Sequence, residues 1–196
     1  MESLETNVRG YDYGHTTKTS PVTLKDLELL KATVMFTQVD EDNLRKAGEV
    51  LVEQADAVMD IWYELIGSHP HLLNYFSKNN MANLEYLTAV RQRFIQWVKD
   101  VCLRPFDQTW LNYQYEIGLR HHRIKKNKTD EIEAAPIVHY RYITAFIYPI
   151  TATIKPLLAN KGHAPEEVEA MHQAWFKAIV LTATLLTYPY VRAGEF

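Results

Sequence analysis

The chain has 196 residues, of which 47% are hydrophobic, and its formal net charge is −3 at pH 7. This length fits a single domain with a sizeable core, and the slight negative charge excludes a general attraction to nucleic acid. No apolar run reaches the roughly 18 residues of a membrane span, and the N-terminal residues MESLETNVRG lack the apolar core of a signal peptide. Cys102 is the only cysteine, which excludes an intrachain disulfide and fits a cytoplasmic protein.

The first segment, residues 1–22, is polar and is interrupted by Gly10 and Pro21. These residues break regular structure, so we expect an extended arm instead of a helix. Tyr11 and Tyr13 give this arm apolar surface to bury. The alternative is a mobile tail, which is common at chain termini.

Helical periodicity fills the remainder of the chain, and no segment is a credible strand. Thr23 is a plausible N-cap for a helix that runs to about Thr37. Asp40 is expected to cap a longer helical stretch, from Glu41 to about Ile66. The other expected helices span residues 71–76, 83–102, 107–122, 137–159 and 165–187. Pro149 lies inside one of them and predicts a kink there. The pattern predicts an all-α protein.

The helix expected over residues 107–122 ends in two adjacent histidines, His121 and His122. Successive residues of an α-helix lie about 100° apart, so His121 falls on an apolar, aromatic stripe while His122 points away from it. That stripe also carries Trp110, Tyr113, Gln114 and Ile117. A histidine on such a face is either a satisfied core residue or a cofactor ligand, and the spacing alone leaves both open.

A basic cluster follows these histidines. It consists of Arg120, Arg123, Lys125, Lys126 and Lys128. Such a cluster can bind a polyanion, but the simpler interpretation is that the cations lie in water and complement the negative end of the helix dipole.

Three sequence stretches resemble the protoglobins, a family of single-domain haem globins related to the sensor domains of globin-coupled sensors. They are GSHPHLLNYF, YQYEIGLRHHR and YRYITAFIYPITATIKP. The similarity runs from about Gly10 to the C-terminus. It implies a globin fold, a helical sandwich with an extra N-terminal helix. It also implies an arm over residues 1–22 that packs on the haem region and a globin domain over residues 23–196.

The resemblance implies haem b (iron protoporphyrin IX) as the cofactor, with His121 as the proximal ligand of the iron. No CxxCH motif occurs, so the haem would be held non-covalently. The helix expected over residues 83–102 would cover the distal side, and because it carries no histidine the iron would be five-coordinate. The cofactor-binding residues implied are His121, Trp62, Tyr63, Val90, Arg93, Phe94, Ile117, Val138, Phe146 and Ile150.

Two of these residues carry specific expectations. The family match places Arg93 near the haem propionates, which suits its charge. It places Tyr63 on the distal side, where its hydroxyl is the best candidate to donate a hydrogen bond to bound dioxygen. The alternative is that this hydroxyl turns away and bonds to the backbone.

The function we expect is reversible binding of diatomic gases, namely dioxygen, carbon monoxide and nitric oxide, and this class includes oxygen transport. A second class is enzymatic: detoxification of nitric oxide or peroxynitrite, weak peroxidase chemistry, or carbene transfer. No flavin or nicotinamide motif such as GxGxxG supports such turnover, so we expect no enzyme. A gas sensor that acts through a separate partner is a third possibility, and a helical interaction module without haem is a fourth.

The two C-terminal helices are apolar on more than one face, which indicates that a further surface covers them. The residues that suggest this are Tyr148, Ile154, Trp175, Leu181 and Leu185. Protoglobins dimerise through these two helices, so the resemblance implies a homodimer joined by residues 140–187.

Overall fold

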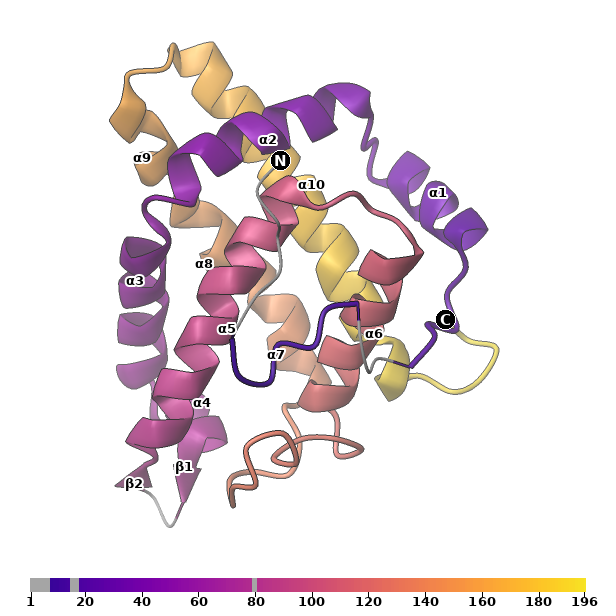
Figure 1. Ribbon diagram of the computed structural model, residues 1–196, viewed down its shortest axis with the longest axis vertical. Helices are drawn as coiled ribbons and strands as arrows, with labels where there is room; N and C mark the ends of the chain where they lie inside the picture. The colour runs from indigo at the N-terminus through magenta and orange to yellow at the C-terminus, as the bar shows by residue number, and fades with distance from the viewer. Residues whose placement is uncertain (1–7, 15–17, 79–80) are drawn as a thin grey trace.

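Helices make up nearly all the regular structure of the computed structural model, which describes residues 8–14, 18–78 and 81–196 (Figure 1). The α-helices are α1 (Leu24–Thr33), α2 (Gln38–Leu51), α3 (Ala55–Gly67), α4 (Pro70–Leu73), α5 (Leu84–Leu103), α6 (Gln108–His121), α7 (Tyr140–Ala145), α8 (Ile147–Ala152), α9 (Ile154–Leu158) and α10 (Pro165–Leu186). Short 3-10 turns occur at Asn74–Phe76, Ala159–Lys161 and Tyr188–Tyr190. The prediction of an all-α globin fold is confirmed.

One feature outside this pattern is a small hairpin between α4 and α5. Its strands are β1 (Ser77–Lys78) and β2 (Met81–Ala82), which pair antiparallel. The sequence had suggested no strand, because two residues are too few for an alternating pattern to be visible.

The start of α1 follows the prediction, whereas the start of α2 does not. Thr23 accepts a hydrogen bond from the Asp26 backbone N–H at 3.2 Å, and Asp26 accepts one from the Thr23 N–H at 2.9 Å, as in a capping box. Asp40, the expected cap of the next helix, is instead the third residue of α2. Its carboxylate accepts from the Thr37 N–H at 2.7 Å, so Thr37 is the N-cap.

The helical stretch expected over residues 41–66 consists of two consecutive helices, as in globins, because α2 and α3 are separated at residues 52–54. Gln54 explains the break. Its backbone N–H bonds to the Leu51 carbonyl at 3.1 Å, while its side-chain amide takes the Val50 carbonyl and reaches the Leu157 carbonyl in α9, both at 3.2 Å. The side chain thus replaces the backbone bond that would have continued α2.

Prolines divide the stretch that had been expected as one helix over residues 137–159. The helical segments α7, α8 and α9 are interrupted at Phe146 and Thr153, three residues before Pro149 and Pro156. A proline has no N–H to bond to the carbonyl four residues earlier. The disruption expected from Pro149 is confirmed, and Pro156 adds a second one.

The stretch Tyr140–Lys161 is also the one part of the described chain that is long and apolar enough to cross a membrane, with a mean hydropathy of 1.2. A single stretch of this length and hydropathy does not indicate a membrane span, since core helices of soluble proteins have the same length and hydropathy. Only 22% of its most apolar part is buried within this chain.

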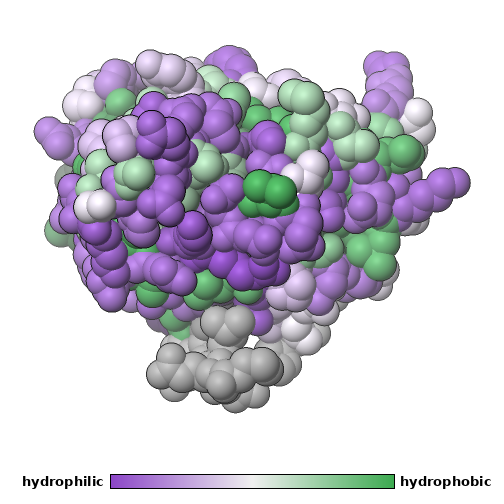
Figure 2. All heavy atoms as spheres, turned by 90° about the horizontal axis from the view of Figure 1, so that it is seen from above, coloured by the Kyte–Doolittle hydropathy of each residue, from purple (hydrophilic) through white to green (hydrophobic). Residues whose placement is uncertain are grey.

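The helices pack in two layers around a main core, and a smaller apolar cluster lies between α1, α6 and the end of α10. In one layer α5 contacts α2 and α3, and in the other α10 contacts α6 and the α7–α9 segments; α10 also packs against α2 (Figure 1). Met171 and Trp175 of α10 are fully buried where these layers meet. Seen from above, the surface is mostly hydrophilic with scattered apolar residues (Figure 2). This arrangement leaves a cavity between α5, α6, α7–α8 and the end of α10.

Candidate functional site

The cavity has a volume of about 250 Å³, and its walls are mainly apolar. It lies between α5 and α6, and the segment after α6 and the described part of the N-terminal arm close it. Cofactor sites in proteins are concave and mostly apolar, with a few well-placed polar groups. The predicted cofactor residues that the structure brings to its wall are Val90, Arg93, Phe94, Ile117, His121, Val138, Phe146 and Ile150.

His121 is the last residue of α6 and lies in the cavity wall. Its Nδ1 is 2.9 Å from the Ile117 carbonyl oxygen. A carbonyl can only accept, so Nδ1 carries the proton and Nε2 keeps its lone pair. Burial lowers the pKa of His121 below its ordinary value, which keeps the ring neutral at pH 7. A neutral, oriented imidazole is the form that binds a metal.

His122 does not line the cavity. It is the C-cap of α6, with an extended backbone (φ −86°, ψ 156°). Its ring packs edge-on against Tyr190, with centroids 4.9 Å apart. The two histidines therefore point in different directions, as the stripe on the helix predicted.

The α5 side of the cavity is apolar and aromatic. Val90 and Phe94 lie one turn apart on it, and Trp97 joins them; its ring meets that of Phe94 edge-on at 6.1 Å. Trp97 was not among the predicted site residues. Its position three residues after Phe94, on the same helix face, was the signal that could have identified it.

Trp62 and Tyr63 were expected to contact the cofactor, but neither lines this cavity. Trp62 packs behind the wall, 6.2 Å from Phe94 between ring centroids, and its indole N–H donates to Thr153 Oγ1 at 2.8 Å. The Tyr63 hydroxyl donates to the Leu87 carbonyl at 3.0 Å. Of the two alternatives for the Tyr63 hydroxyl, the structure shows the bond to the backbone, which uses its one hydroxyl proton within the protein.

For the gas binding that the family resemblance implies, the Tyr63→Phe variant is therefore expected to keep the wild-type dissociation rate of dioxygen. The lost neutral hydrogen bond should instead lower the free energy of unfolding by about 0.5–1.5 kcal/mol. Stopped-flow release of dioxygen, together with urea unfolding of the same samples, measures both quantities. A severalfold faster release would show that the hydroxyl reaches the ligand after all.

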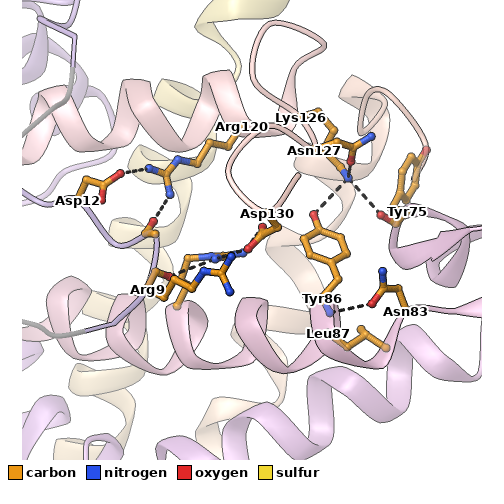
Figure 3. A network of polar contacts seen from close by, with 12 residues as sticks. Arg9, Asp12, Tyr75, Asn83, Tyr86, Leu87, Arg120, Lys126, Asn127 and Asp130 are labelled. Atoms are coloured by element: carbon orange, nitrogen blue, oxygen red, sulfur yellow. Dashed lines mark hydrogen bonds and ion pairs between the residues drawn. The ribbon is translucent and has the colours of Figure 1, made fainter. Parts of the chain in front are cut away.

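The described part of the arm closes one side of the cavity. Tyr11 lines the cavity, is 6% exposed, and donates to Asp100 Oδ2 at 3.0 Å. Arg120 of α6 holds the arm by donating to the Gly10 carbonyl and by pairing with Asp12 at 2.8 Å (Figure 3). Gly10 has a φ of +74°, and a Cβ there would lie 2.8 Å from the Thr129 side chain.

The expected division into an arm over residues 1–22 and a globin domain over residues 23–196 stays a prediction.

The polar part of the cavity wall is built largely by the segment after α6 and adjoins the arm, since Arg93 donates to the Arg9 carbonyl at 3.2 Å. Arg93 pairs with Asp130 through two contacts, at 2.9 and 2.7 Å. Lys125 pairs with Glu116 at 2.6 Å. Lys126 is only 7% exposed, so the expectation that this basic cluster lies in water is wrong for Lys126. Both lysines line the cavity.

The cavity fits an amphipathic ligand that carries its own metal. Its described lining offers one imidazole, apolar walls and several cationic side chains. Thr182 Oγ1 of α10 also lines it and is buried without a hydrogen-bond partner in the described structure. In the part of the chain that the structure describes, no three His, Cys, Asp or Glu side chains group to hold a metal ion. A haem needs only one protein ligand, because its macrocycle supplies four nitrogens.

Comparison with known proteins identifies the fold and the family. The globin domain of a Geobacter sulfurreducens globin-coupled sensor has a similar fold, with a TM-score of 0.67, 15% sequence identity, and coverage of 85% of this chain and 98% of that chain. No curated protein matches the chain. The family model described as Protoglobin matches residues 23–196. The chain therefore belongs to the protoglobin family of haem-based gas-binding globins.

Proposed function

We propose that the cavity holds a b-type haem whose iron takes His121 as its only protein ligand, and that the protein reversibly binds dioxygen, carbon monoxide and nitric oxide there. When bound, ferrous haem supplies the gas-binding chemistry. One observation carries the proposal. His121 lies in the wall of a largely apolar cavity, and because its Nδ1 donates to the Ile117 carbonyl, its neutral ring keeps Nε2 free to bind a metal.

His121 contributes a fixed ring and a basic nitrogen. The Ile117 carbonyl accepts from Nδ1–H at 2.9 Å, which holds the ring orientation and strengthens Nε2 as a ligand. Among the cavity-lining residues that the structure describes, His121 is the one imidazole. Val90, Phe94 and Trp97 on the α5 side offer no comparable ligand, which supports a five-coordinate iron with a site open to gases.

The apolar walls contribute exclusion of water. Ile117, Val138, Phe146 and Ile150 line the cavity, and none of their side chains has a hydrogen-bonding group. Dry surroundings keep water away from a metal and so tune its redox behaviour. We infer that these four residues slow oxidation of ferrous iron, as a reversible gas carrier requires.

Absorption spectra of the purified protein in ferric, ferrous and carbon monoxide forms test the proposal. A Soret band that shifts on reduction and again with carbon monoxide supports it. A protein purified with added haem that shows no Soret band contradicts it and favours a helical interaction module. Steady consumption of nitric oxide with a cellular reductant would instead assign the protein to the enzymes.

We also propose that the protein is a cytoplasmic homodimer joined through α7–α9 and α10. Support comes from Tyr148, which is 78% exposed, and Phe176, which is 40% exposed, on these helices. Other residues that suggested a dimer are taken up by the core of this chain. They are Ile154, Trp175, Leu181 and Leu185, each at most 3% exposed.

The dimer predicts a specific response to charge. The wild type should be a dimer at micromolar concentration, and Tyr148→Arg should be largely monomeric, because a cation would be placed in an apolar interface. Met81→Arg is the matched control, since Met81 is 72% exposed but lies on the β2 hairpin. Light scattering measures the mass of each; a monomeric wild type contradicts the proposal.

A further inference from the structure

We propose that Tyr75 and His139 form a proton-coupled electron-transfer pair, which carries electrons one at a time from a small reductant at the surface to an oxidised cofactor in the cavity. This inference rests on the proposed haem site and adds a route by which that site is reduced after it meets a peroxide. The observation behind it is a short contact between a phenol in the cavity wall and an exposed imidazole.

Tyr75 lies in the 3-10 turn that follows α4, is 6% exposed and lines the cavity. Its hydroxyl oxygen is 2.6 Å from Nδ1 of His139, which is the N-cap of α7. His139 itself is exposed to solvent. One short hydrogen bond therefore joins the cavity wall to the surface.

The phenol is the donor in this hydrogen bond. Burial raises the pKa of Tyr75, and a hydrogen bond from the His139 backbone opposes this rise only in part, so the phenol keeps its proton at pH 7. A backbone N–H can only donate, so the phenol oxygen accepts from it and turns its own proton toward Nδ1. The imidazole of His139 is thus placed to accept that proton.

This contact suits one-electron oxidation of a tyrosine. A phenol that loses an electron becomes a very strong acid, so the oxidation is favourable only where a base takes the proton in the same step. When Tyr75 passes an electron to a cofactor that a peroxide has oxidised, its O–H bond breaks and the proton moves to His139 Nδ1.

A small one-electron reductant such as ascorbate completes the cycle. It gives an electron to the phenoxyl radical of Tyr75, and His139 returns the proton to the phenol oxygen. Over two rounds, one hydrogen peroxide is reduced to two waters, and two molecules of the reductant each lose one electron and one proton.

Ring contacts also connect Tyr75 to the surface. Its ring meets that of Tyr142 with centroids 5.9 Å apart, and Tyr142 in turn lies 5.5 Å from the ring of His71. His71 is exposed. Because electron transfer weakens steeply with distance, neighbouring rings that reach the surface favour exchange with a reductant in solution.

The other tyrosines of the described cavity wall lack this arrangement. Tyr11 donates to a carboxylate that is only 3% exposed, so its acceptor offers no site to a reductant. The Tyr86 hydroxyl accepts from the Lys126 ammonium at 3.2 Å, and a neighbouring positive charge opposes the removal of an electron. Among the described residues, no hydrogen bond joins the hydroxyl of Tyr113 or Tyr142 to an imidazole.

The competing explanation is that the pair only fastens the turn after α4 to the start of α7. His139→Gln separates the two roles, since an amide oxygen still accepts from the phenol but is not a base. Tyr75→Phe removes the hydroxyl and keeps the ring. Tyr142→Phe is the matched control, because it removes a hydroxyl from a neighbouring tyrosine that also lines the cavity.

The experiment adds hydrogen peroxide to the ferric haem protein and follows the radical by rapid freezing and electron paramagnetic resonance. A nitroso spin trap and peptide mass spectrometry then identify the residue that carries it. Wild type and Tyr142→Phe should form a tyrosyl radical on Tyr75, and Tyr75→Phe should lose most of the signal. His139→Gln should form it at least about tenfold more slowly, since a positioned base contributes about 10²–10⁴-fold to a proton transfer.

An equal radical signal in wild type and Tyr75→Phe would overturn the inference, and so would spin-trap adducts on other tyrosines alone. An unchanged rate in His139→Gln would leave the pair with a fastening role only. If Tyr75→Phe does not fold, adduct mapping in wild type and His139→Gln makes the same distinction. Failure of the haem site itself gives a different result, since wild-type protein would then show no Soret band before peroxide is added.

Discussion

The His121→Ala variant is expected to lose its haem during purification. In the wild type, the free Nε2 of His121 is the single imidazole nitrogen that the described cavity wall offers to an iron. Removal of this ligand should weaken haem binding at least about a hundredfold, because second-shell changes alone typically cost 10–100-fold in metal affinity. Added imidazole should restore a Soret band, since it can fill the space that the side chain leaves. The absorption spectrum with and without imidazole measures this.

His122→Ala is the matched control. It removes an imidazole from the next position in the chain, but that ring packs against Tyr190 and lies outside the cavity wall. This variant should keep the wild-type Soret band and haem content. A reversed outcome, with haem lost in His122→Ala and retained in His121→Ala, would overturn the assignment of the ligand.

The orientation of His121 could be predicted because the rotation per residue of an α-helix is fixed. The position of Val90 and Phe94 in the cavity wall agrees with the same reasoning for α5. Helix caps follow chemistry that is local in sequence, so Thr23 was identified. Asp40 was misplaced because Thr37 and Asp40 form a reciprocal pair, and either residue alone resembles a cap.

Side chains whose partners are distant in sequence could not be predicted. Lys126 bonds to Tyr75 and Tyr86, which lie 51 and 40 residues away, and no spacing rule connects a loop to such partners. Its neighbours in the basic cluster suggested an exposed position. The Tyr63 hydroxyl raised the same difficulty, since the rotamer that takes it to the Leu87 carbonyl depends on packing between α3 and α5.

The close approach of α6 and α10 depends on Gly118. A Cβ at this position would lie 2.8 Å from the Leu186 carbonyl oxygen and 3.3 Å from the Leu186 Cα. These are backbone atoms of the last residue of α10, so no side-chain rotation can relieve the contact. Gly118 also lies one turn before His121 on α6, and Leu186 lines the cavity. A change here should therefore affect both stability and the site.

Gly118→Ala should lower the free energy of unfolding by about 1–3 kcal/mol through overpacking, even though alanine favours a helix by up to about 1 kcal/mol. At about 2–4 °C per kcal/mol for a chain of this size, the Tm should fall by several degrees, and haem should dissociate faster as His121 shifts with α6. Gly67→Ala is the control, because Gly67 ends α3 and its Cβ would meet nothing within 4 Å. Thermal unfolding and haem transfer to an acceptor globin measure both effects. Equal stability of the two variants would show that α6 and α10 are not in close backbone contact at Gly118.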